Sequence, residues 1–158
     1  MKKITEKKLR EILEQHKLWL DSNEKEGKCA DLTDADLRFA NLYGAYLTGA
    51  DLRGSNLNFA NLRRADLTSA DLSHTNLTSV DLSGAVLTDA DLTDTDLRRA
   101  DLAFANLSDA NLSDANLSGA NLLETDLRRA NLTGTDLICV DLTRANLYRV
   151  DLTGVDLT

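Results

Sequence analysis

A leucine falls at every fifth position from Leu32 to Leu157, so 26 leucines stand in one unbroken register. The residue two places before each leucine is small, and it is alanine at 17 of the 26 sites. The residue directly before the leucine is Asp or Asn everywhere except at Tyr46 and Val86. The repeating unit is therefore Ala-(Asp/Asn)-Leu followed by two variable residues, and it fills residues 30–158.

This five-residue period excludes an ordinary helix or strand. An α-helix turns about 100° per residue, so successive leucines would lie about 140° apart around the helix and share no buried face. On a flat strand, an odd period sends successive leucines to opposite faces. A chain that is extended over Ala-Asp-Leu and turns a corner over the next two residues satisfies the pattern. Each repeat then forms one side of a polygon, and the coils stack into a solenoid.

The exceptions to the repeat predict how many sides a coil has. With four repeats per coil, every fourth repeat falls on the same side of the polygon. On the side that begins with Leu37, the small residue two places before the leucine is not alanine in 5 of 7 repeats. On the other three sides together, it is not alanine in 4 of 19 repeats. Tyr46 and Val86 lie 40 residues apart and fall on one side. Phe39 and Phe59 lie 20 residues apart, which is the spacing of stacked neighbours. All three observations favour a coil of 20 residues.

The chain resembles the pentapeptide repeat proteins, whose A-(D/N)-L-x-x tandem is matched across residues 30–158. The resemblance implies an all-β solenoid in the form of a right-handed quadrilateral β-helix. The length of the repeat region corresponds to about six and a half coils, or a rod on the order of 30 Å tall at a strand spacing of roughly 4.8 Å. The chain resembles the cyanobacterial members of the family that have an N-terminal helical cap.

Residues 1–28 lack the repeat and follow a helical pattern instead. Thr5 is the expected N-cap, and residues 23–27 are the expected stop. The residues expected to contact the first coil fall at helical spacing: Leu9, Ile12, Leu13, His16, Trp19 and Leu20. We expect an α-helical cap over residues 1–28 that covers the open end of a solenoid over residues 29–158. The alternative is a basic helix that binds a membrane surface or a partner.

The charges of the repeat region are unevenly distributed. The side that begins with Leu32 has a net charge of −7, and each of the other three sides has −1. We call this side the acidic face; its only arginine is Arg53, and its acids are Asp31, Asp34, Asp51, Asp71, Asp91, Asp94, Asp114 and Asp151. Asn111 and Asn131 occupy the same column, so Asp and Asn can also be interchangeable surface residues here.

Three functions remain open. The preferred one is a non-enzymatic scaffold that presents the acidic face to a protein partner of unknown identity. The second is a DNA mimic, because an acidic rod imitates the regular charge spacing of a duplex; the resemblance includes members that inhibit DNA gyrase and protect against quinolones. Paired arginines on the other sides and the absence of long loop insertions count against that role. The third is a passive rod that associates with itself.

The end of the repeat favours self-association. The repeat continues in register to Thr158, and the last coil would expose apolar side chains and unpaired backbone groups. Dimerisation through this end is known in the family, so a homodimer is expected through Leu142, Leu147, Leu152, Val155 and Leu157. Fraying of the last coil in water is the alternative.

Enzymatic activity is not expected. Ser73, His74 and Asp71 have the residue types of a catalytic triad, but a convex wall offers no pocket to exclude water. No phosphate loop, nucleotide motif or metal-ligand spacing occurs, and the acids near Asp91 offer at most a weak Ca²⁺ contact, so no cofactor or metal is expected.

The net charge of −8 argues against direct binding of nucleic acid. No segment has the length of a membrane span, and Cys29 and Cys139 are too far apart to pair, so a cytoplasmic location without membrane contact is expected.

Overall fold

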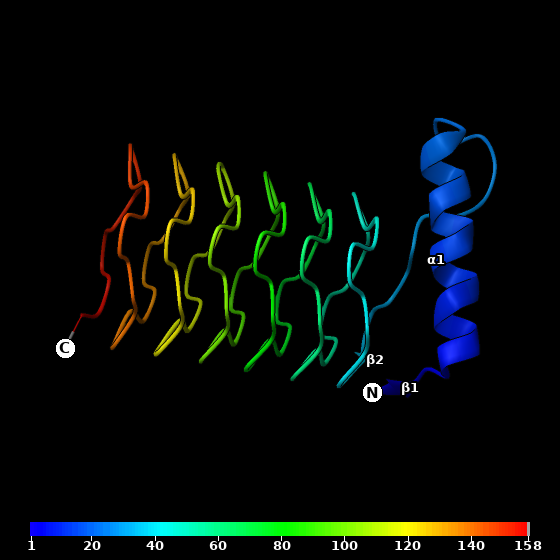
Figure 1. Ribbon diagram of the computed structural model, residues 1–158, viewed down its shortest axis with the longest axis horizontal. Coiled ribbons are helices and arrows are strands. Elements are labelled where there is room, and N and C mark those ends of the chain that lie inside the picture. The colour runs from blue at the N-terminus through cyan, green and yellow to red at the C-terminus, as the bar shows by residue number, and fades with distance from the viewer. Residues whose placement is uncertain (158) are drawn as a thin grey trace.

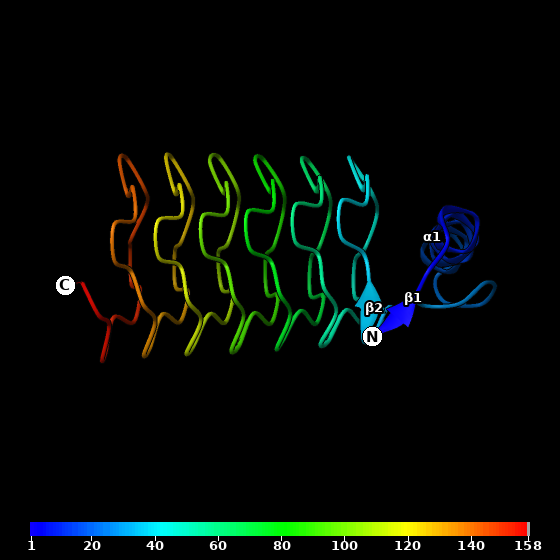
Figure 2. The same cartoon turned by 90° about the horizontal axis from the view of Figure 1, so that it is seen from below.

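The structure, a computed structural model, describes residues 1–157 and consists of a solenoid with a helix across one end (Figure 1). Strand β1 (Lys2–Lys3) is followed by helix α1 (Glu6–Asp21) and strand β2 (Ala35–Asp36). From β2 onward the chain winds in stacked coils to the C-terminal end. The view from below shows the same stack, with α1 beyond the first coil (Figure 2).

The coils are joined by parallel bridges between residues 20 positions apart. In one ladder, Asp31 pairs with Asp51, Asp51 pairs with Asp71, and the series continues to Asp151. Three further ladders begin at Asp36, Asn41 and Tyr46, so each coil contributes one bridge residue to each of four ladders. This confirms the expected 20-residue spacing, and the solenoid is a β-helix.

Each bridge residue directly precedes a leucine, and it is Asp or Asn except at Tyr46 and Val86. Its N–H donates to the small residue of the coil before, as Asp91 does to the Ala70 carbonyl at 3.0 Å. The following leucine N–H donates to the coil after, as Leu92 does to the Asn111 carbonyl at 2.7 Å. The extended part of each repeat therefore satisfies its backbone groups on both neighbouring coils.

The corners are tight turns closed by the leucine carbonyl. The Leu47 carbonyl accepts a hydrogen bond from the Ala50 N–H at 3.0 Å, and the intervening Gly49 has a φ of +66°. This second turn residue has a positive φ at every corner from Asp34 to Gly154, as a type II turn requires. Most corners carry a residue other than glycine, and all three phenylalanines of the chain, Phe39, Phe59 and Phe104, occupy such positions.

The interior is a column of leucine and alanine layers. The central leucines from Leu32 to Leu137 are at most 4% exposed, and most of the alanines two places before them are equally buried. The hydroxyl residues that replace alanine on one side also lie inside and stack in one column, namely Ser55, Thr75, Thr95 and Thr135. The exceptions in the repeat therefore follow the columns of the fold.

The N-terminal segment covers the first coil with a helix and a strand. The Thr5 side chain caps α1 by accepting from the Lys8 N–H at 3.2 Å, as expected from the sequence. The helix ends at Asp21, and Ser22 is the C-cap. β1, which the sequence analysis missed, pairs in parallel with β2 and places Lys2 beside Ala35. The division into a cap over residues 1–28 and a solenoid over residues 29–158 stays a prediction.

Candidate interaction surface

The Asp or Asn before each leucine is bound to the backbone of its own repeat. At Asp91, a carboxylate oxygen accepts from the Thr93 N–H at 3.0 Å and from the Thr93 hydroxyl at 2.6 Å. The same bond to the N–H two residues on recurs along the solenoid from Asp31 to Asp151. It satisfies an N–H in the turn that the ladders leave unpaired. The Asp/Asn preference of the repeat therefore has a structural cause, and either residue type serves.

This bond divides the acids of the acidic face into two kinds. The first kind precedes a leucine and is used in the turn; these ladder carboxylates are Asp31, Asp51, Asp71, Asp91 and Asp151. The second kind is the second turn residue; these corner carboxylates are Asp34, Asp94 and Asp114. All three corner carboxylates are exposed and accept no backbone hydrogen bond within residues 1–157. They are the acids of the acidic face whose carboxylates are not bound to the backbone of the turns.

Two of the corner carboxylates lie above glycine corners of the next coil. The Asp34 Oδ1 is 2.7 Å from the place that a Cβ at Gly54 would occupy, and Asp114 stands over Gly134 in the same way. A side chain at Gly54 or Gly134 would therefore compete with the carboxylate of Asp34 or Asp114 for the same space. The third, Asp94, has its Oδ2 3.5 Å from the His74 Nδ1, and its side chain is 51% exposed.

Arg53 is the arginine that reduces the charge of the acidic face. It binds Asp51 through two nitrogens, at 2.9 Å and 2.6 Å, and its Nε is 3.5 Å from the next carboxylate, Asp71. The hydrogen bonds from Arg53 lower the pKa of Asp51, and the hydrogen bonds of Thr33 lower the pKa of Asp31. These carboxylates therefore remain charged below the usual titration range of Asp.

The residue types of a triad do not form one here. The Ser73 hydroxyl donates to Asp71 at 2.7 Å, within its own repeat. His74 is instead directed to Asp94 in the next coil. The serine and the histidine therefore have different carboxylate partners, and the arrangement of a nucleophile with its base is missing.

On the other three sides, several acids are paired with nearby arginines. The guanidinium group of Arg38 binds both oxygens of Asp36 at 2.8 Å and lowers the pKa of that carboxyl to about 2. The same arginine two residues after an acid recurs in the pairs Asp96–Arg98 and Asp126–Arg128, while Asp109–Arg129 and Glu124–Arg144 join successive coils. On the acidic face, by contrast, Arg53 is the only arginine that binds the carboxylates within residues 1–157.

The cap residues predicted from the helical pattern face the first coil. Leu9, Ile12 and Leu13 are partly buried against the core. His16 is fully buried, and its ring stacks on Trp19 with 5.5 Å between the centroids. Trp19 and Leu20, the last two predicted contact residues, are also partly buried.

His16 joins the helix to the first coil through a hydrogen bond. Its Nδ1 accepts from the Ala30 N–H at 3.0 Å, so the ring must be neutral with its proton on Nε2. Burial lowers the pKa of His16, while the Thr48 carbonyl nearby raises it by a smaller amount. This buried contact, rather than charge, explains why the helix carries a histidine on its apolar stripe.

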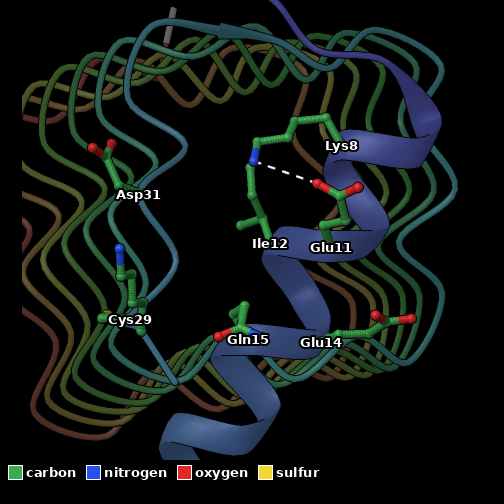
Figure 3. A pocket seen from close by; sticks show the side chains of 8 residues that line it. Lys8, Glu11, Ile12, Glu14, Gln15, Cys29 and Asp31 are labelled. Carbon is green, nitrogen blue, oxygen red and sulfur yellow. Dashed lines mark hydrogen bonds and ion pairs between the residues drawn. The ribbon is translucent and has the colours of Figure 1, made fainter. Parts of the chain in front are cut away.

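Two hollows flank the helix where it crosses the first coil. The first, of about 570 Å³, lies between the coil at Cys29 and Asp31 and the helix side with Ile12 and Gln15 (Figure 3). Its charged side chains are of both signs, and Lys8 and Glu11 pair with each other across 3.4 Å. The second hollow lies on the other side of α1. Its lining includes the apolar residues Ile4, Leu9, Leu13 and Phe39 beside charged side chains of both signs.

The last coil exposes the residues predicted for a dimer. Leu147, Leu152 and Leu157 are 38%, 47% and 69% exposed, whereas the equivalent leucines of earlier coils are buried. Leu142 and Val155, the other two predicted residues, are partly buried. The leucine N–H groups of this coil from Leu142 to Leu157 have no backbone partner within residues 1–157.

Sequence reasoning missed an exposed aromatic surface. Phe39 and Phe59 are 71% and 55% exposed, and their rings stack with centroids 5.4 Å apart. Tyr43, on the neighbouring side, is also exposed and accepts from Arg64 at 3.2 Å. The sequence carries a signal for this surface, because aromatic residues at corner positions cannot reach the core and a 20-residue spacing stacks Phe39 on Phe59.

Residues 1–157 contain no cluster of metal ligands and no membrane-spanning helix, and their two cysteines are unpaired. Within this range no three acidic, His or Cys side chains come close enough to hold a metal ion. Over the same range, no helical segment has the length and apolarity of a membrane span. Cys29 and Cys139 are exposed free thiols.

Comparison with known proteins identifies the repeat. The family described as Pentapeptide repeats matches in 8 copies over residues 30–68, 65–102, 105–138 and 125–158. No curated protein gives a significant match.

Solved structures give further matches. HetL, a pentapeptide repeat protein involved in heterocyst differentiation regulation in the cyanobacterium Nostoc, is 39% identical with a TM-score of 0.54; the match covers 82% of this chain and 62% of HetL. This chain thus spans less than two thirds of the length of HetL. Rfr23 from the cyanobacterium Cyanothece is 33% identical with a TM-score of 0.69, over 72% of this chain and 91% of Rfr23. QnrB1, a plasmid-mediated fluoroquinolone resistance protein, is 22% identical with a TM-score of 0.42. The match covers 81% of this chain and 82% of QnrB1. This similarity is too low to support a functional argument.

Pentapeptide repeat proteins are generally non-enzymatic and structural. The family match spans almost all of the solenoid, and the 20-residue spacing of the ladders corresponds to four of its five-residue units. This chain is a member of the pentapeptide repeat family.

Proposed function

We propose that the chain is a protein-interaction scaffold without catalytic activity, and that its acidic face binds a basic surface of a protein partner. One observation supports this most strongly: the corner carboxylates Asp34, Asp94 and Asp114 are exposed on one straight side and are not used by the backbone. A row of fixed charges favours a partner with a complementary charge and speeds its association.

The scaffold form is part of this proposal. We take the solenoid as a right-handed quadrilateral β-helix of about six and a half coils, as the family resemblance implies. A straight rod of this kind keeps the acids of one ladder in line. We also place the protein in the cytoplasm, because its two cysteines are exposed and unpaired.

The test uses affinity capture from an extract of the native host with three baits. One bait is the wild-type chain, and the second carries Asp34→Asn, Asp94→Asn and Asp114→Asn, which remove charge while leaving the turns intact. The third carries Asp89→Asn, Asp101→Asn and Asp136→Asn on the other sides and is the matched control. We expect a basic protein to be captured by the wild type and the control and lost with the corner variant. Equal capture by all three baits would reject the acidic face as the binding surface.

DNA gyrase is a specific candidate for the target of the acidic face. The support is the straight row of carboxylates with a single arginine, which resembles the charge spacing of a DNA strand. The measurement is gyrase supercoiling with the wild-type chain and with the corner variant. Inhibition that disappears in the corner variant supports this role, and unchanged supercoiling at micromolar protein removes it.

Self-association is a further proposal for the partner. We propose that the last coil packs against the last coil of a second copy, because its leucines are exposed and its N–H groups are unpaired. Light scattering on the wild-type chain should give the mass of a dimer, and Leu147→Glu with Leu152→Glu should give that of a monomer. A wild-type monomer at high concentration would contradict this contact.

A further inference from the structure

The cap does not cover the first coil evenly. Ala30 and Ala35 are at most 2% exposed beneath the N-terminal segment, but Ala40 and Ala45 in the same coil are partly exposed. On the side of Ala40, a groove of about 610 Å³ separates α1 from the coil. We call it the cap groove; its apolar lining residues are Ile4, Leu9, Leu13, Leu37, Phe39 and Ala40.

An unpaired backbone edge lies along the cap groove. In the ladder that begins at Asn41, each later bridge residue makes two hydrogen bonds with the preceding coil. The Asn61 N–H, for example, donates to the Ala40 carbonyl, and the Asn61 carbonyl accepts from the Leu42 N–H. Asn41 is the first residue of the ladder, and its N–H and carbonyl have no hydrogen bond within residues 1–157. This edge can therefore pair with an added strand.

The neighbouring ladder shows such pairing. β1 lies in parallel beside β2, with Lys2 opposite Ala35 and Lys3 opposite Asp36, and takes the place of a preceding coil. The chain then leaves the edge and enters α1 at Glu6. The next ladder, at Asn41, has no equivalent of β1, although the coil presents the same backbone groups there.

The outer wall of the cap groove is aromatic. Phe39 lines the groove and stacks on Phe59 in the next coil, so the two rings form one apolar strip leading away from it. Aromatic side chains with this exposure are typical anchors of protein interfaces. We call this pair the aromatic strip.

The charges around the groove favour an acidic occupant. The groove and its continuation past Ile4 carry Lys3, Arg10 and Arg38 against Glu6 and Asp36, a small positive excess in a chain whose net charge is −8. Arg38 is already bound to Asp36, but Arg10 makes no ion pair within residues 1–157. Arg10 is thus free to meet a carboxylate.

We propose that the cap groove binds an extended, acidic segment of a partner protein that alternates apolar and acidic residues. Its backbone pairs with the open edge at Asn41, as β1 pairs with β2. Alternate apolar side chains then face Leu9, Leu13 and the aromatic strip, while acidic ones face Arg10. The hollow on the other side of α1 is less suited to this, because its lining is mostly charged (Figure 3).

Single-stranded nucleic acid is the competing ligand, since aromatic rings beside arginines also stack bases. The described surface here lacks the continuous positive groove that such binding uses, because Asp36 and Glu6 interrupt it. This alternative is therefore one outcome of the test.

The experiment measures fluorescence polarisation of a labelled peptide of roughly eight residues, the length of a strand, that alternates Glu with Val and Phe. The full chain should bind it saturably. Phe39→Asn with Phe59→Asn should weaken binding at least about tenfold, because asparagine tolerates the positive φ but removes the rings. Phe104→Asn is the matched control, since Phe104 is equally exposed, has a φ of +60° and lies outside the groove; it should change binding by less than about twofold.

Two further probes test the backbone pairing and the charge. The same peptide with N-methylated amides cannot donate to the edge, and a version with Lys in place of Glu opposes Arg10; both should bind at least about tenfold more weakly. A single-stranded oligothymidylate should not bind. The proposal is overturned by an absence of saturable peptide binding, by equal loss in the Phe104 control, by an N-methylated peptide that binds as tightly, or by tighter binding of the oligothymidylate. Because the acidic face lies elsewhere, its own test is unaffected by any of these results.

Discussion

The Nδ1 atom of His16 accepts a hydrogen bond from the backbone N–H of Ala30 at 3.0 Å. Ala30 is the first small residue of the repeat, so this bond ties the helix to the point where the solenoid begins. The ring is fully buried, and the positively charged form cannot accept this bond.

We predict that docking of the cap depends on pH through His16. Burial lowers the folded pKa of His16 below the model-peptide value of 6.5, so the unfolded state binds more protons between these two values. The stability of the cap is therefore complete above about pH 6.5 and declines as the pH falls toward the folded pKa. Trp19, the only tryptophan, stacks on His16 and reports cap unfolding by fluorescence. His16→Gln keeps an acceptor without titrating, and persistence of the pH dependence in this variant would contradict the assignment.

Gly27 should be essential for the return of the chain from the cap. It has a φ of +74°, and an added Cβ would meet backbone atoms of the helix, with the Trp19 nitrogen 2.8 Å away. Gly27→Ala should therefore destabilise the cap by more than about 2 kcal/mol. Gly49 also has a positive φ, but nothing lies within 4 Å of its added Cβ, so Gly49→Ala should cost only about 1 kcal/mol. Denaturant unfolding followed at Trp19 and by circular dichroism would show whether the two costs are instead alike.

The Asp of a repeat should be replaceable by Asn and not by Ala. Asp91→Asn keeps an oxygen to accept from the Thr93 N–H, whereas Asp91→Ala leaves this N–H without a partner. We expect almost no change for the first and a loss of about 1 kcal/mol for the second, measured by urea unfolding. An equal loss for both would mean that charge rather than the turn determines the residue type.

Among the buried hydroxyl residues that replace alanine, Ser55 should lower the stability of the fold. The Ser55 hydroxyl is buried and has no hydrogen-bond partner within residues 1–157. Ser55→Ala should therefore raise the free energy of unfolding by about 1 kcal/mol. Thr95 is the control, because its hydroxyl donates to the Leu92 carbonyl at 2.7 Å, and Thr95→Val should lower stability by a similar amount. A decrease in stability for Ser55→Ala would refute the unpaired state of its hydroxyl.

The repetitive part of the fold was predictable because every repeat carries the same information. The leucine at each fifth position defined the coil, and the 20-residue spacing of Phe39 and Phe59 correctly predicted a stacked pair. The Thr5 cap followed from ordinary helix-start chemistry. Each of these features depends on short, local preferences.

The features that were missed depend on contacts between distant residues. β1 has only two residues and no periodicity, and it exists because the edge at Ala35 is open. The uneven cover that leaves Ala40 partly exposed depends on how α1 crosses the coil, which no local pattern describes. The division of the acidic face into ladder and corner carboxylates likewise required the hydrogen bonds of the turns.

Isothermal titration of the captured partner into the wild-type chain and into the variant with Asp34→Asn, Asp94→Asn and Asp114→Asn tests the central claim most directly. The variant should melt at the wild-type temperature, since these side chains make no backbone hydrogen bond, and it should bind the partner at least about tenfold more weakly. An unchanged affinity in the folded variant would contradict this claim.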